Sequence, residues 1–136
     1  METEKTTLLT SYIEEVKIDT KLDEFSLKNS QLQLPAVKHK WVARGIQNKI
    51  QIQKLLKEKS KIIKEVATKL RDEAPVKLTM IAAEKASEGH EKVMEIDNQI
   101  KECKLIEEYL EKVEKIFSSF TFDLRNVIQI IQLETL

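Results

Sequence analysis

Residues 93–120 read "VMEIDNQIKECKLIEEYLEKVEKIFSSF". Its apolar side chains recur at steps of three or four residues, which places them on one side of an α-helix. They are Val93, Ile96, Ile100, Cys103, Ile106, Leu110, Val113, Phe117 and Phe120, with one irregularity near Cys103. Such a stripe must be buried against another helix. The pattern therefore predicts a long helix that packs against a partner, with Cys103 as a small core residue.

The partner is residues 35–72. Pro35 suits the first turn of a helix, and Pro75 disfavours a helical residue before it, so we expect the helix to begin at Pro35 and end near Asp72. At about 100° per residue, its apolar side chains gather on one face. These are Val37, Trp41, Ile52, Leu55, Leu56, Ile62, Ile63, Val66 and Leu70. The two long helices are predicted to form an antiparallel hairpin.

Shorter elements flank this hairpin. Residues 1–34 form an acidic segment with an amphipathic helix around Leu8–Lys17 and a second short helix after it. The acidic arm of the hairpin occupies residues 77–118, with a bend or interruption at Gly89. A last helix over residues 121–134 begins with Thr121 as its N-cap. The prediction is a single all-α domain, residues 1–136, with short N-terminal and C-terminal helices.

Composition excludes several classes of protein. Glycine and proline number only two each, and 34% of the 136 residues are charged, which is typical of long helices. One cysteine gives no intrachain disulfide framework and fits a reducing compartment. No apolar run approaches the roughly 20 residues that span a bilayer, and the polar start is unlike a signal peptide. We expect a soluble intracellular protein with no membrane contact.

Motifs for catalysis are missing from the sequence. It has no glycine-rich phosphate loop, no zinc-ligand spacing, and no nucleophile beside a base and an acid. His39 and His90 stand alone, and the carboxylates lie at helix positions with lysines nearby. We expect no enzyme activity, no cofactor and no metal.

Charge is unevenly distributed although the net charge is zero. Residues 1–34 carry four Lys against seven Asp and Glu, a net −3, and residues 72–136 carry eight Lys and Arg against fourteen acids, a net −6. Residues 35–71 carry eleven Lys and Arg against Glu58 and Glu65, a net +9. A segment this basic favours contact with a polyanion over a merely solvated helix face.

The basic residues form a ridge on the face opposite the apolar one. Lys54, Lys57, Lys61 and Lys64 follow one another at steps of 3, 4 and 3, and Arg71 lies near the end of the ridge. Because aromatic residues make up only 5% of the chain, binding is expected to depend on phosphates more than on base stacking. Sequence preference should therefore be small.

Before this ridge, the same outer face is apolar, at Val42, Ile46 and Ile50. The last helix is also more apolar than the end of a monomer requires. We therefore predict an oligomer interface formed by Val42, Ile46, Ile50, Phe120, Leu124, Val127, Ile128 and Ile131. Trp41, with Lys40 and Arg44 beside it, has two readings: packing in the hairpin or between subunits, or contact with DNA.

Residues 34–73 and 93–134 carry a resemblance to the UvsY recombination mediator proteins of large tailed bacteriophages, and this resemblance covers most of the chain from about Ile18 onward. The sharpest signals are the pair Lys40 and Trp41, the lysine-rich helix that follows, and "SSFTFDLRNVIQI" at residues 118–130. The resemblance implies a ring-like homo-oligomer, hexameric or heptameric, in the cytoplasm of the infected bacterial host. It implies binding to single-stranded DNA, displacement of single-strand DNA-binding protein, and loading of a RecA-like recombinase, without ATPase or nuclease activity. The DNA contacts it implies are Lys57, Lys61, Lys64, Lys69 and Arg71.

Two other functions compete with this one. A structural coiled-coil or scaffold oligomer would use its lysines only for solubility and would not bind nucleic acid. A helical adaptor would bind an acidic protein through the same ridge, and an oligonucleotide would compete with that partner.

Overall fold

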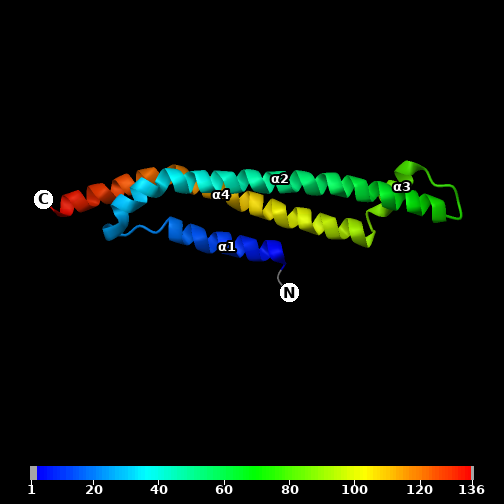
Figure 1. The fold of residues 1–136 in the computed structure, drawn as a ribbon, viewed down its shortest axis with the longest axis horizontal. Coiled ribbons are helices and arrows are strands. Elements are labelled where there is room, and N and C mark those ends of the chain that lie inside the picture. Colours follow the sequence, from blue (N-terminus) through cyan, green and yellow to red (C-terminus); the bar gives the residue numbers. More distant parts are fainter. Residues whose placement is uncertain (1–2, 136) are drawn as a thin grey trace. The chain divides into compact units, whose positions relative to one another are not determined.

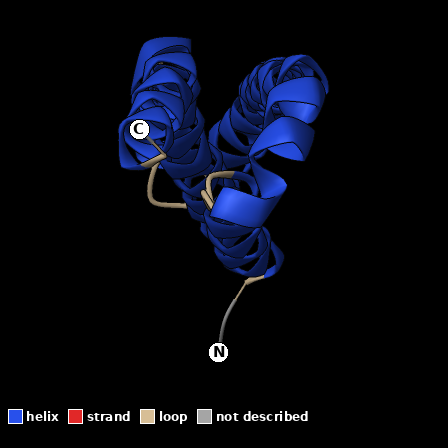
Figure 2. Ribbon diagram, turned by 90° about the vertical axis from the view of Figure 1, so that its left-hand side faces the viewer, coloured by secondary structure: helices blue, strands red, loops and turns tan. Residues whose placement is uncertain are grey.

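In the computed structural model, residues 3–135 are described and contain four α-helices and one 3₁₀ turn. The helices are α1 (Glu4–Asp19), α2 (Leu27–Glu73), α3 (Met80–Ser87) and α4 (Glu91–Glu134), and the turn is η1 (Glu24–Ser26). No strand occurs in residues 3–135, and short loops join the helices (Figure 2). The all-α prediction is confirmed.

Local signals account for several of the helix ends. The Thr3 side chain accepts a hydrogen bond from the backbone N–H of Thr6 and so caps α1, and Thr79 caps α3 in the same way through Ala82. His90 precedes α4, and its Nδ1 accepts from the backbone N–H of Lys92 at 3.2 Å. The interruption predicted at Gly89 is therefore real and separates α3 from α4.

The predicted start of the second helix at Pro35 is wrong. α2 begins eight residues earlier, at Leu27, and Pro35 lies inside it. A proline there lacks the N–H that would reach the carbonyl of Gln31 and disturbs the preceding turn. Leu34 nevertheless belongs to a hydrophobic core, and Leu27 packs against that core, so tertiary burial favours the helical path. The other end agrees closely, because α2 ends at Glu73.

The predicted break at Thr121 is also wrong. α4 continues through this residue to Glu134 as one helix of 44 residues, coloured from yellow to red in Figure 1, where α2 covers part of it. Phe120 and Leu124 are four residues apart and both are buried, so the apolar stripe extends past Thr121. The Thr121 hydroxyl accepts a hydrogen bond from Lys38 Nζ at 3.2 Å instead of capping a helix.

The chain divides into two compact units. Unit 1 comprises Met1–Gln47 and Ile106–Leu136, and unit 2 comprises Asn48–Leu105. In unit 1, α1, the first part of α2 and the last part of α4 enclose a core centred on Trp41, Val113 and Phe117. The full set of buried core residues is Val16, Leu34, Trp41, Ile106, Leu110, Val113, Phe117, Phe120 and Leu124.

Unit 2 contains the rest of α2, α3 and the first part of α4. Its core cluster is Ile52, Leu55, Ile96, Ile100 and Cys103, with Ile62 packed against it. Asn48 contacts Cys103 and Lys59 contacts Asp97, so α2 and α4 run antiparallel in this unit. All nine predicted stripe residues of α4 are buried, whereas Leu56, predicted to face inward, is 46% exposed.

Asn48 is a buried polar residue whose contact fixes the register of the two helices in unit 2. Its Nδ2 donates to the backbone carbonyl of Cys103 at 2.9 Å. A single buried amide of this kind specifies one helix pairing, because other registers leave it without a partner.

Asn48→Ala should lower the free energy of unfolding by about 1–3 kcal/mol, because it removes both the hydrogen bond and buried volume. Asn48→Leu should be neutral or slightly stabilising, since an apolar side chain of similar size fills the space. Chemical denaturation followed by circular dichroism measures both variants. Equal losses for alanine and leucine would contradict this assignment and make the hydrogen bond itself the stabilising contact.

Candidate nucleic-acid interface

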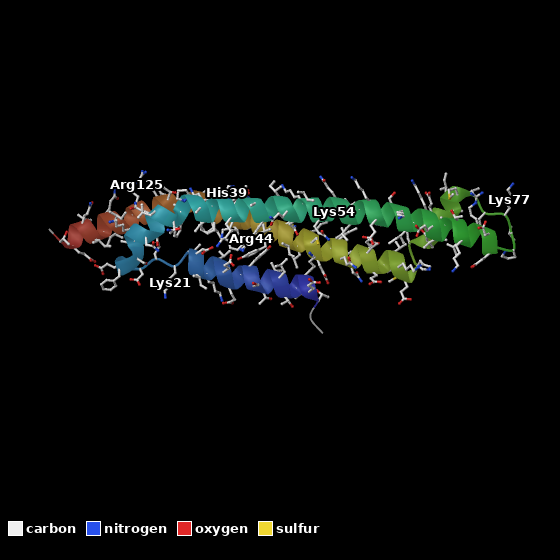
Figure 3. The ribbon with its side chains drawn as sticks, viewed as in Figure 1. Lys21, His39, Arg44, Lys54, Lys77 and Arg125 are labelled. Atoms are coloured by element: carbon white, nitrogen blue, oxygen red, sulfur yellow. The ribbon has the colours of Figure 1, made fainter. Side chains whose placement is uncertain are left out.

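The lysine ridge consists of Lys54, Lys57, Lys61 and Lys64, on the part of α2 that belongs to unit 2; Figure 3 labels its first member. At about 100° per residue, the four lie within an arc of about 80° on the helix. All four side chains are exposed. Within residues 3–135, none of the four ammonium groups forms a salt bridge. The ridge therefore presents four cations that form no ion pair with the described part of the chain.

A neighbouring lysine behaves differently. Lys59 Nζ lies 2.6 Å from Asp97 Oδ1 of α4 and forms a partly buried ion pair between the helices of unit 2. Glu58 and Glu65 are exposed and follow Lys54 and Lys61 by one turn. Residues 54–71 contain seven Lys and Arg against these two acids, a net +5. The surface stays strongly basic after its own acids are counted.

The other two residues of the predicted DNA-binding set differ in position. Arg71 falls within about 20° of Lys64 on α2, so it extends the ridge, while Lys69 falls about 140° away. Arg71 Nε donates to the backbone carbonyl of Leu78 at 3.2 Å, which holds its guanidinium near the end of α2. A groove of about 280 Å³ lies there, lined by Thr68, Arg71, Asp72, Lys77 and Leu78. The structure groups Arg71 with the ridge and separates Lys69 from it.

A second groove, of about 400 Å³, borders the ridge in unit 2. Its lining combines apolar and charged side chains from α2 and α3: Leu56, Lys59, Ser60, Ile63, Lys64 and Glu84. Unit 2 contains no Phe, Trp or Tyr. A strand on this surface would therefore be held through its phosphates, with no aromatic ring to stack on its bases.

Lys40, Trp41 and Arg44 lie in unit 1 and face α1 (Figure 3, where Arg44 is labelled). Trp41 is 1% exposed, and its Nε1 donates to Asp19 Oδ2 at 2.9 Å. Lys40 Nζ lies 2.6 Å from the same Asp19 oxygen and 3.2 Å from Glu15 Oε2. Arg44 NH1 donates to Glu15 Oε2. Trp41 was predicted either to pack against protein or to contact DNA. In this structure it packs within its own chain.

Aromatic and cationic groups stack in the same cluster. The rings of Tyr12 and Trp41 meet edge to face with centroids 5.5 Å apart. The Arg44 guanidinium carbon lies 4.7 Å from the Trp41 ring centroid and 5.0 Å from that of Tyr12. The hydrogen bond from Arg44, together with the weaker one from Lys40, lowers the pKa of the Glu15 carboxyl against the opposing effect of desolvation. The cluster keeps Glu15 ionised.

The α1 partners of this cluster were missed from the sequence. A signal was present: Glu15 and Asp19 are four residues apart, and so are Lys40 and Arg44. Two acids and two bases with equal spacing can pair when their helices run antiparallel. Because they are separated by 21 to 29 residues, local helix patterns do not reveal the pairing.

The residues predicted to join subunits fall into two groups. Val42 and Ile46 in unit 1 are 45% and 52% exposed, and Ile50 in unit 2 is 47% exposed. Phe120 and Leu124, by contrast, are buried in the core of unit 1, so they are corrected from interface to core residues. Truncation after Phe120 would remove Leu124 from that core and is no clean test of assembly. The remaining three, Val127, Ile128 and Ile131, are half-buried.

The rest of the described chain offers little other chemistry. Among residues 3–135, no group of three or more His, Cys, Asp or Glu side chains is placed to hold a metal ion. None of the described helices is both long enough and apolar enough to cross a membrane.

Comparison of the chain with models of protein families, with curated proteins and with solved structures finds no match. Two groups of residues stand out: the exposed lysine ridge of unit 2, and the cluster of unit 1 in which Lys40 and Arg44, both half-buried, flank the buried Trp41.

Proposed function

We propose that this chain is a recombination mediator of the UvsY type. It binds single-stranded DNA without sequence preference and promotes the loading of a RecA-like recombinase in place of single-strand DNA-binding protein. The observation that best supports this proposal is the lysine ridge, whose four exposed ammonium groups form no salt bridge with any described residue. Each lysine that contacts a phosphate releases a condensed counterion, and this release favours binding.

The mode of binding follows from the side chains around the ridge. Lysines contact phosphates as point charges, and unit 2 has no aromatic ring that could stack on a base. The base edges of the bound strand therefore stay open. A recombinase that pairs bases needs a strand in this state, so phosphate-only binding suits a protein that passes the strand on.

One subunit offers too few cations for tight binding, and assembly supplies the rest. A ring of six or seven subunits would place several ridges along one strand and raise their effective concentration. Exposed Val42 and Ile46 support self-association, because apolar side chains grouped on a helix surface favour burial against another chain. The setting of this activity is recombination, repair and replication of phage DNA in the cytoplasm of the infected host.

Lys57→Ala combined with Lys61→Ala tests the ridge. We expect the slope of log K against log salt to become shallower by about 1.4, because each phosphate contact to a single strand contributes about 0.7. At 0.1 M salt this corresponds to a loss of affinity of about 25-fold. Fluorescence anisotropy of a labelled single-stranded oligonucleotide, titrated at several salt concentrations, measures both quantities.

Lys101→Ala combined with Lys104→Ala is the matched control, since both lysines are exposed in unit 2 but lie on α4. This control should bind like the unmodified chain. Affinity that does not depend on salt, or equal effects of the two double variants, would refute the ridge as the binding surface. An oligomer with no affinity for the oligonucleotide would instead identify a structural scaffold.

A further inference from the structure

The side chains of Lys40, Trp41 and Arg44 have the composition of a single-strand binding site. Such sites combine cations for the phosphates with aromatic rings for the bases. Lys40 Nζ lies 5.2 Å from the Trp41 ring centroid, and Arg44 stacks on the same ring. This is the only tryptophan of the chain. The ridge of unit 2 lacks this combination.

Two carboxylates of α1 contact the cationic and N–H groups of this cluster. Asp19 Oδ2 accepts from both Lys40 Nζ and Trp41 Nε1, and Glu15 Oε2 contacts both Lys40 and Arg44. Carboxylates and phosphates are the two anions that Lys and Arg bind best in proteins. α1 therefore presents a short row of negative charge to α2, as a nucleic-acid backbone does.

α1 packs against the core of unit 1 through one buried side chain and three half-buried ones. Val16 is the one buried residue of α1, while Leu8, Leu9 and Tyr12 are half-buried. The connection from α1 to α2, residues 20–26, contains no buried residue, and its Phe25 is 96% exposed. Separation of α1 from α2 would expose Val16, its half-buried apolar neighbours on α1 and the part of the Trp41 ring that Tyr12 covers. α1 is also held by ion pairs and hydrogen bonds to Lys40, Trp41 and Arg44, and these are contacts that a polyanion can replace.

We propose that α1 is an intramolecular competitor for a second single-stranded nucleic-acid site, formed on α2 by Lys40, Trp41 and Arg44. A strand binds there, with phosphates on Lys40 and Arg44 and a base against Trp41, only when Glu15 and Asp19 have left. The nature of the ligand rests on the proposed function, while the competition by α1 follows from the contacts in unit 1. α1 thereby adjusts how tightly each subunit holds its strand.

The test removes the two competing charges from the full-length chain, as Glu15→Gln with Asp19→Asn. Two freed cations should steepen the salt slope by about 1.4 and raise affinity for a labelled oligothymidylate about 25-fold at 0.1 M salt. Oligothymidylate should also quench Trp41 emission more strongly in this variant than in the unmodified chain. Val16→Ser, which loosens α1 without changing any charge, should shift affinity and quenching in the same direction.

Glu4→Gln with Glu14→Gln is the matched control. It also removes two charges from α1, but Glu14 pairs only with Lys17 of the same helix among the described residues. An equal gain in this control, or no gain from Glu15→Gln with Asp19→Asn, would overturn the inference. Adding Lys40→Ala and Arg44→Ala to the latter variant should abolish its gain, and a gain that persists would overturn it as well.

The two proposals fail in different ways. If Lys57→Ala with Lys61→Ala weakens binding but Glu15→Gln with Asp19→Asn does not strengthen it, the competition by α1 is refuted. The ridge then still stands as the binding surface. If Glu15→Gln with Asp19→Asn raises affinity only while Lys40 and Arg44 are present, and the ridge substitutions change nothing, the ridge is refuted as the binding surface. The competition by α1 then still stands. Absence of oligothymidylate binding in every variant refutes both.

Discussion

Trp41→Ala is expected to lower the free energy of unfolding by about 3–5 kcal/mol, the largest loss from any single substitution we foresee in unit 1. Trp41 is 1% exposed and lies in a core with Val113 and Phe117. Truncation would leave a cavity and would also remove the ring on which Tyr12 and Arg44 pack. Denaturant unfolding followed by circular dichroism measures the loss.

Trp41→Phe separates packing from hydrogen bonding. Phenylalanine keeps most of the buried ring but lacks the N–H that reaches Asp19. Asp19 still has Lys40 as its partner, so the expected loss is smaller, about 1–2 kcal/mol. A loss below about 1 kcal/mol for Trp41→Ala would show that Trp41 is not an essential part of the core.

The sequence predicted the core of α4 better than the ends of the helices. Burial of every third or fourth residue depends on a periodic pattern, and nine residues from Val93 to Phe120 repeat it. Helix ends depend on single residues, and tertiary contacts can override these. Pro35 lies inside α2 because Leu34 is buried before it, and Thr121 lies inside α4 because Leu124 is buried after it.

The candidate site shows the same division. The exposure of Lys54, Lys57, Lys61 and Lys64 followed from helical spacing and a local excess of bases. The pairing of Lys40 and Arg44 with α1 did not, because it needs a contact between helices remote in sequence. A count of charges by segment assigns Lys40 and Arg44 to the basic surface, whereas the fold neutralises them with Glu15 and Asp19.

Ile46→Asp should break the proposed assembly and with it most of the affinity for a long single strand. Ile46 is 52% exposed, so the aspartate reaches water in the isolated subunit and the fold should be kept. In a contact between subunits, the same carboxylate would be buried without a partner, which strongly opposes association. Sedimentation should then report the mass of a single chain.

The effect on binding should depend on the length of the strand. The variant should bind an oligonucleotide long enough for several subunits about 10²–10⁴-fold more weakly, because the ridges of separate subunits no longer bind the same strand together. An oligonucleotide that covers one ridge should bind the variant and the unmodified chain equally. Ile81→Asp, at an 81% exposed position in α3, controls for the added charge and should change neither mass nor affinity. An unchanged mass for Ile46→Asp would show that this part of α2 does not lie in the subunit interface. A lower mass with full affinity for the long strand would show that one subunit binds tightly by itself.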